Sequence, residues 1–237
     1  MQQSSRRLQS AHFLAHTVQE IRFRFLEVSD VCEESRRRFA AQQPQAKGDG
    51  KLINYRFAAF SSLVQTIKDI LPVILERTVS WSSLSHIRHL HFMKSIRNAV
   101  AHDGNPVINL WVDGCYYVAC DFVRLGWNHQ PLAVKAPIED VHTIIVEFTE
   151  DLCSYLRDAF SHYVGDQTLI GPLYGQEFFN TAINHPAIPE YAQRLYGELD
   201  RSALQLDPCE PLSEALKELD SIVTLCRTAK RNQGAGM

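Results

Sequence analysis

Long amphipathic segments constrain the fold of this chain more than any other feature of its sequence. From about Ser5 to Gln43, apolar residues return at roughly helical spacing, and Ser4 or Ser5 can supply an N-cap. The same periodicity predicts further long helices over about 52–79, 84–102 and 138–164, and shorter ones over 175–184, 189–206 and 211–230. Such helices bury their apolar faces mainly against one another, which indicates an all-α fold built as an antiparallel helical bundle.

Between the third and fourth long helices the periodicity changes. Residues 107–112 and 115–124 are rich in β-branched and aromatic side chains, and Asp113-Gly114 between them favours a tight two-residue turn. We therefore predict one β-hairpin over 107–124, packed near the end of the third helix. The expected organisation is a helical domain over 1–165 that includes this hairpin, followed by a helical C-terminal extension over 166–237.

Charge and composition narrow the classes of function. The chain of 237 residues has 24 Lys and Arg against 27 Asp and Glu, a formal net charge of -3, so any nucleic-acid contact needs a local basic patch. No Walker loop or G-x-G-x-x-G motif supports nucleotide hydrolysis. We expect a cytoplasmic protein, because the N-terminus lacks an apolar signal segment and no uncharged run approaches the length of a membrane span.

The six cysteines are scattered, without a C-x-x-C pair. They are Cys32, Cys115, Cys120, Cys153, Cys209 and Cys226. This spacing indicates neither a zinc site nor a disulfide framework, and reduced thiols are the simpler interpretation. We expect no cofactor and no metal.

The residues with the clearest chemical potential lie at the end of the third helix. Arg97, Asn98 and His102 occur there in the run R-N-A-V-A-H, and the turn residues D-G-N-P at 103–106 follow directly. Asn98 and His102 are four residues apart and lie on one helix face, and Lys94 and His91 extend this polar stripe. Phe92, Ile96, Ala99 and Val100 on the other side are expected to hold the helix against the bundle.

This motif resembles the signature of the HEPN superfamily, which is an Arg, then a polar residue, then a His four to six positions after the Arg. Arg97, Asn98 and His102 occupy those places, and the helical surroundings over 5–164 fit the family loosely. The resemblance implies a metal-independent endoribonuclease of toxin–antitoxin, phage-defence or RNA-processing systems, with a composite site between the motif helices of a homodimer. Some family members are inactive binding modules or scaffolds. A tyrosine that some toxins carry two positions after the His is Gly104 here.

The residue types suit phosphodiester chemistry. His102 can accept the proton of a ribose 2′-hydroxyl or donate one to the leaving 5′-oxygen, and Arg97 can neutralise charge on the pentavalent phosphorus. Asn98 can hydrogen-bond the substrate or orient a side chain of the partner subunit. Because DNA lacks the 2′-hydroxyl, the expected substrate is RNA, and the expected products carry a 2′,3′-cyclic phosphate and a 5′-hydroxyl.

Two other groups of residues are candidates for binding. Arg36, Arg37 and Arg38 give the first helix a basic section that is either solvated surface or a contact for the RNA backbone. His86, His89 and His91 have the spacing of possible metal ligands, but His91 lies off the helix face that the other two share. We therefore interpret them as solvated or substrate-contacting histidines.

Three interpretations remain open at this stage. The first is a dimeric RNA-cleaving enzyme built around Arg97 and His102, with lysine and arginine side chains binding the RNA and an antitoxin or regulatory protein as a possible partner. The second is a non-catalytic helical module that uses the same face to bind RNA, a nucleotide or a protein. In the third, Arg97 and His102 only interact with the carbonyls and dipole of the helix end.

Overall fold

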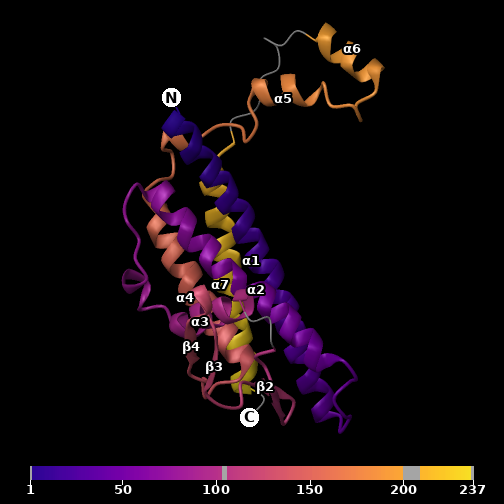
Figure 1. Ribbon diagram of the computed structural model, residues 1–237, viewed down its shortest axis with the longest axis vertical. Coiled ribbons are helices and arrows are strands. Elements are labelled where there is room, and N and C mark those ends of the chain that lie inside the picture. The colour runs from indigo at the N-terminus through magenta and orange to yellow at the C-terminus, as the bar shows by residue number, and fades with distance from the viewer. Residues whose placement is uncertain (1, 103–105, 200–208, 236–237) are drawn as a thin grey trace.

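The computed structural model describes residues 2–102, 106–199 and 209–235, and these residues are mostly helical (Figure 1). The α-helices in this part of the chain are α1 (Gln2–Ala40), α2 (Asp49–Leu75), α3 (Leu90–His102), α4 (Val141–Ser161), α5 (Gln176–Ala182), α6 (Glu190–Glu198) and α7 (Pro211–Ala235). The strands are β1 (Leu110–Val112), β2 (Cys115–Tyr117), β3 (Phe122–Leu125) and β4 (Pro131–Val134). Single turns of 3-10 helix cover Ser82–Leu84, Trp127–His129 and Gln167–Leu169.

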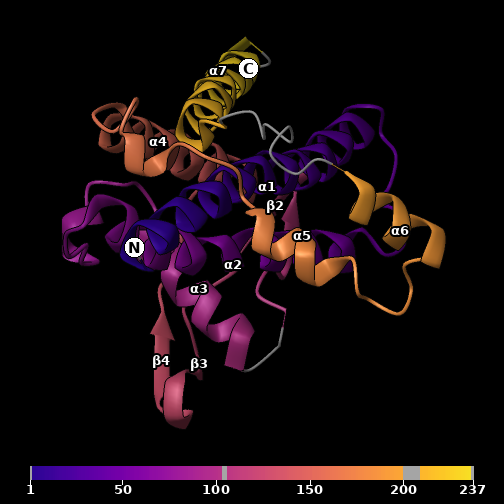
Figure 2. The same ribbon diagram turned by 90° about the horizontal axis from the view of Figure 1, so that it is seen from above.

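Helix α1 is buried along one side for most of its length. Its buried apolar residues return every three or four positions and include Ala11, Leu14, Val18, Ile21, Phe25, Val28 and Cys32. This spacing places them on one helix face, against which α2, α4 and α7 pack. The four long helices consequently lie side by side, with α3 against α2 (Figures 1 and 2). The long helix expected over 5–43 is confirmed, with its ends shifted to Gln2 and Ala40.

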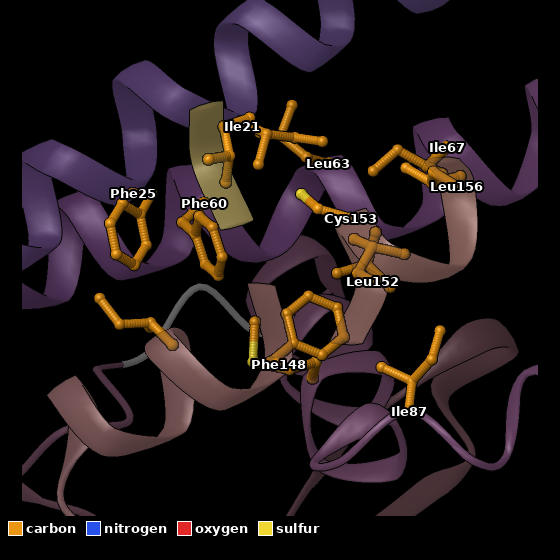
Figure 3. Close-up of a cluster of buried hydrophobic side chains, with 14 of the residues drawn as sticks. Ile21, Phe25, Phe60, Leu63, Ile67, Ile87, Phe148, Leu152, Cys153 and Leu156 are labelled. Atoms are coloured by element: carbon orange, nitrogen blue, oxygen red, sulfur yellow. The ribbon is translucent and has the colours of Figure 1, made fainter. Parts of the chain in front are cut away.

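The core is formed where side chains from three of these helices meet. Figure 3 shows Phe25 of α1, Phe60 of α2 and Phe148 of α4 in one apolar cluster. The rings of Phe60 and Phe148 meet edge to face, with centroids 6.2 Å apart. Ile87, in the segment that precedes α3, reaches the same cluster, so the core also fixes the approach to α3 (Figure 3).

A buried arginine joins the helices at the end where α1 begins. The Nε atom of Arg7 donates to the carbonyl of Ile74 at 2.9 Å, and Nη1 donates to Asp166 and Thr168 at 2.8 and 2.7 Å. Arg7 is only 7% exposed, so its charge depends on these partners for compensation. The contacts tie the start of α1 to the end of α2 and to the segment after α4.

Helix α2 is the most apolar of the long helices. Among the described residues it is the one helix long and apolar enough to cross a membrane, by length and composition alone, and half of its apolar window is buried inside the fold. A proline inside a helix usually kinks or divides it. The helix instead continues through Pro72 and ends three residues later at Leu75, followed by Glu76 in the left-handed region at φ 49°.

The described chain contains two short β-hairpins where the sequence predicted one. Strands β1 and β2 pair across Asp113-Gly114, whose φ values of 49° and 80° confirm the tight turn. The expected second strand over 115–124 ends at Tyr117, where the Asn109 side chain accepts a hydrogen bond from the Ala119 amide and turns the chain. Strand β3 then pairs with β4 instead.

The two hairpins lie on different parts of the molecule. The β1–β2 hairpin packs against α1 and α4, whereas the β3–β4 hairpin packs against α3. Of the segment 107–124, which was expected to pack near the end of the third helix, β1 and β2 have their main contacts elsewhere. It is β3, paired with β4, that lies beside α3.

The segment after residue 165 divides into two parts. Leu219, Ile222 and Cys226 of α7 are fully buried against α1 and α4, so the expected boundary after 165 does not separate α7 from the core. Helix α7 also continues to Ala235, past the expected end at 230. Helices α5 and α6 contain no buried residue and lie beyond the end of the long helices where α1 begins (Figure 1). The helix expected over 189–206 ends at Glu198, and residues 200–208 lie outside the described chain.

The packing of the first hairpin on α1 can be tested at Gly114. A Cβ atom there would lie 2.9 Å from the Cα of Arg36, in a backbone at φ 80°. Gly165 has the same φ and open space around it. We expect Gly165→Ala to cost about 1 kcal/mol through strain alone, and Gly114→Ala to cost roughly 1–3 kcal/mol more through overpacking. Urea unfolding of both variants measures the difference, and equal losses would contradict the packing.

Candidate functional site

The motif helix α3 presents one apolar and one polar side. Leu90, Met93, Ile96 and Ala99 are buried, and Phe92 packs on Phe57 of α2 with ring centroids 6.3 Å apart. The apolar backing expected from the sequence is therefore present, although Val100 is only half-buried. Because α3 is anchored through this side, its polar side is held in a fixed direction.

Two of the three motif side chains lie within the described part and contact each other. Arg97 and Asn98 are both half-buried, and Nη1 of Arg97 donates to Oδ1 of Asn98 at 3.0 Å. His102 is the last residue of α3, but its side chain lies outside the described part, as do the turn residues 103–105. Within the described part of the chain, the other guanidinium N–H groups of Arg97 form no hydrogen bond or ion pair.

The stripe that leads to the motif is polar and accessible. His91 is exposed on the first turn of α3. The Nζ atom of Lys94 lies 4.9 Å from the ring centroid of Trp81, a cation–π contact typically worth about 0.5–1 kcal/mol at partly exposed sites. This contact holds the ammonium near the protein surface on the same helix as Arg97.

The basic section at 36–38 is largely occupied by contacts within the protein. Arg36 donates to Nδ1 of the buried His142 at 2.9 Å. Arg37 pairs with Glu34, and Nε of Arg38 lies 3.2 Å from the same carboxylate. Since each arginine has an internal partner, this section carries less free positive charge than its sequence suggests.

The Arg36 contact determines the state of His142. A guanidinium can only donate, so Nδ1 accepts, and Nε2 carries the proton that it donates to Ser29 at 3.0 Å. Burial, and then the charge of Arg36, lower the pKa of His142 to about 4. The ring sits in the first turn of α4, where Asp140 caps the helix by accepting from the amides of His142 and Thr143. Helix α4 therefore begins at Val141 and not near Ile138.

The three histidines of the possible metal spacing do not share a helix. Helix α3 begins at Leu90 and not at Leu84, and His89 has a left-handed backbone at φ 58°. His89 instead contacts Glu147 at 2.9 Å, and the His86 ring packs on Tyr155. Among the described residues no group of three or more His, Cys, Asp or Glu side chains is arranged to hold a metal ion.

Sequence reasoning missed two residues beside the end of α3. Asn54 of α2 accepts from the amides of Val107 and Ile108 at 2.9 Å and donates to the Ile108 carbonyl, which fixes the chain after the motif. Arg124 of β3 donates to the Pro106 carbonyl at 3.1 Å, while its buried Nε has no partner among the described residues. Both contacts join residues far apart in sequence, and no local signal indicates them.

Two cavities lie near α3 and along α4, and neither is lined by Arg97 or Asn98. A small cavity of about 70 Å³ beside the end of α3 is lined by Tyr55, Val100 and Pro106, among others. A larger groove of about 610 Å³ runs along α4 and contains none of the motif residues.

Comparison of this chain with protein families, with curated proteins and with solved structures gives no match.

The state of His142 leads to a prediction for the pH dependence of stability. Between pH 6.5 and about 4 the unfolded chain binds a proton at this residue that the folded chain does not, so the free energy of unfolding falls as pH falls. This residue should account for a loss of roughly 2–3 kcal/mol between pH 7 and pH 4.5. In His142→Gln, whose amide can replace both hydrogen bonds, that part of the loss should disappear, as measured by urea unfolding at both pH values.

The control is His16→Gln on the exposed side of α1. It should keep the pH dependence of the wild type. If His142→Gln loses as much stability as the wild type over the same range, His142 is not held neutral in the folded state.

Proposed function

We propose that this chain is a metal-independent endoribonuclease that cleaves RNA with Arg97, Asn98 and His102. The observation that carries the proposal is the Arg97–Asn98 pair, hydrogen-bonded at 3.0 Å on the half-exposed side of a helix whose other side is buried. Arg97 is a permanent cation on rigid backbone, five residues before His102. Such a cation can stabilise the negative charge that develops on a phosphodiester during phosphoryl transfer. The HEPN-like motif supports the same conclusion.

The proposed reaction is an internal phosphoryl transfer. His102 of one subunit removes the proton from a ribose 2′-hydroxyl, and the 2′-oxygen forms a bond to phosphorus. The bond to the 5′-oxygen breaks, and a second His102 supplies the proton to this leaving group. Arg97 neutralises the negative charge that builds on the non-bridging oxygens. The products are a 2′,3′-cyclic phosphate and a 5′-hydroxyl.

This mechanism requires two copies of the motif. One chain offers a single His102, whereas in-line displacement needs a base and an acid on opposite sides of the phosphorus. We therefore propose a two-fold homodimer in which the α3 helices face each other. We also propose that α1, α2, α4 and α7 form the antiparallel bundle of a cytoplasmic HEPN-type protein acting in a toxin–antitoxin, defence or RNA-processing system.

The roles of Arg97 and His102 are tested by cleavage of total RNA in EDTA. We expect His102→Ala to lower the cleavage rate by about 10²–10⁴-fold and Arg97→Ala by about 10²–10³-fold. Arg97→Lys should restore activity only partly, because an ammonium lacks the planar fork of donors. His16→Ala, on exposed α1, serves as the control and should cleave as the wild type does.

RNA affinity, measured in parallel, distinguishes the enzyme from the binding module. If the wild type binds RNA without cutting it, and Arg97→Ala weakens that binding, the face is a binding surface only. If neither cleavage nor binding responds to these substitutions, the motif has a structural role and the proposal is wrong.

The dimer is tested at Ala101, an exposed residue on the polar side of α3. Two arginines introduced by Ala101→Arg would oppose each other across the proposed axis, so we expect loss of both the dimer and the cleavage activity. Ala119→Arg, at an exposed position after β2, should change neither. Light scattering coupled to gel filtration measures the mass. A monomeric wild-type protein that still cleaves RNA would contradict the composite site.

A further inference from the structure

A groove of about 610 Å³ runs along the C-terminal half of α4, separate from the motif. Its walls include Arg77, which follows α2, His86, which precedes α3, and Tyr155 and His162 of the α4 region. This volume lies in the range of small-molecule sites. The proposed ribonuclease mechanism uses none of these residues.

The two carboxylates that line the groove already have cationic partners. Asp151 accepts from the Nε and Nη2 atoms of Arg88 at 2.7 Å each, and from the Arg88 amide at 3.0 Å. Burial alone would raise the pKa of Asp151, but these hydrogen bonds outweigh it and lower the pKa. Asp158 contacts Arg157 at 3.1 Å. The carboxylates therefore do not require a cationic ligand.

The basic side chains of the groove, in contrast, have no acceptor among the described residues. In the described part of the chain the side chains of Arg77 and His162 form no hydrogen bond or ion pair, and both residues are exposed. Ser154, which also lines the groove, has no hydrogen-bond partner for its hydroxyl in that part either. Arginine stays charged and presents a planar set of donors that matches phosphate oxygens. These donors fit an anion.

An aromatic wall adjoins these donors. The rings of His86 and Tyr155 lie with centroids 5.4 Å apart and an interplanar angle of 54°. Tyr155 is half-buried and packs against the core, so its ring is a firm surface. A flat ring of a ligand can stack on such a surface.

From these observations we propose that the groove is a binding site for a phosphate monoester that carries an aromatic ring. Arg77, His162 and Ser154 bind the phosphate, and Tyr155 with His86 contacts the ring. The partial negative charge of the C-terminal carbonyls of α4 lowers the affinity for an anion by about twofold to fivefold. One charge-assisted hydrogen bond raises this affinity by about tenfold or more. This chemistry occurs both at the 5′-phosphorylated end of an RNA strand and in a free nucleoside monophosphate.

Calorimetry with adenosine 5′-monophosphate and with a short 5′-phosphorylated oligoribonucleotide in EDTA tests the site. Adenosine and the same oligonucleotide with a 5′-hydroxyl are the matched ligands without the phosphate. We expect the phosphorylated members to bind at least tenfold more tightly, Arg77→Ala to abolish this difference, and Tyr155→Leu to weaken binding. If both phosphorylated ligands bind, the site accepts a free nucleoside monophosphate as well as the 5′-phosphorylated end of an RNA. If only the phosphorylated oligonucleotide binds, the site is specific for RNA ends.

The control is Arg194→Ala, which removes an exposed arginine of α6 and should bind as the wild type does. Absence of binding at millimolar concentration, equal affinity with and without the phosphate, or an unchanged preference in Arg77→Ala would overturn the proposal. Adenosine 5′-monophosphate has no phosphodiester to cleave, so its binding can succeed or fail independently of the ribonuclease proposal.

Discussion

Burial of the apolar face of α1 is the constraint on which the rest of the structure depends. Three long helices, α2, α4 and α7, pack against this helix, and two polar contacts hold its ends in register. Arg7 joins the first end to the end of α2 and the segment after α4. Arg36 and Ser29 join the other end to His142 at the start of α4. Each contact satisfies a buried polar group, so sliding one helix along another would leave that group unpaired.

The position of the candidate site follows from this arrangement. Helix α2, held against α1, supplies Phe57 for the apolar side of α3 and Asn54 for the chain that follows the motif. The β3–β4 hairpin covers another side of α3. Arg97, Asn98 and Lys94 are therefore presented by a short helix fixed from several directions, which is the rigidity that a site acting on a phosphodiester requires.

The sequence predicts the helices well and the non-local contacts poorly. Apolar periodicity locates α1, α2, α4 and α7 to within a few residues, because each buries a continuous stripe. It could not show that β3 pairs with β4, since the choice depends on the turn made after Tyr117 through the side chain of Asn109. It placed the start of α3 six residues too early, because Ile87 is buried in the core without being helical.

For the candidate functional residues too, sequence spacing shows which residues are neighbours on a helix but not which distant segments contact each other. Arg97 and Asn98, neighbours in sequence, are hydrogen-bonded to each other on α3, and Lys94 lies one turn before Asn98. In the basic section at 36–38, the spacing does not show that Arg36 is hydrogen-bonded to His142, which is 106 residues away. The groove along α4 could not have been foreseen either, since Arg77, His86 and His162 come from three separate segments.

The central claim is that the 2′-hydroxyl of RNA is the nucleophile and that protein side chains alone activate it. The most direct measurement is cleavage in EDTA of a random-sequence RNA pool, compared with the same pool methylated on every 2′-oxygen. With this mechanism, the wild type should cut the unmodified pool and leave the methylated pool intact. Cleavage of both pools, or of neither, would contradict it.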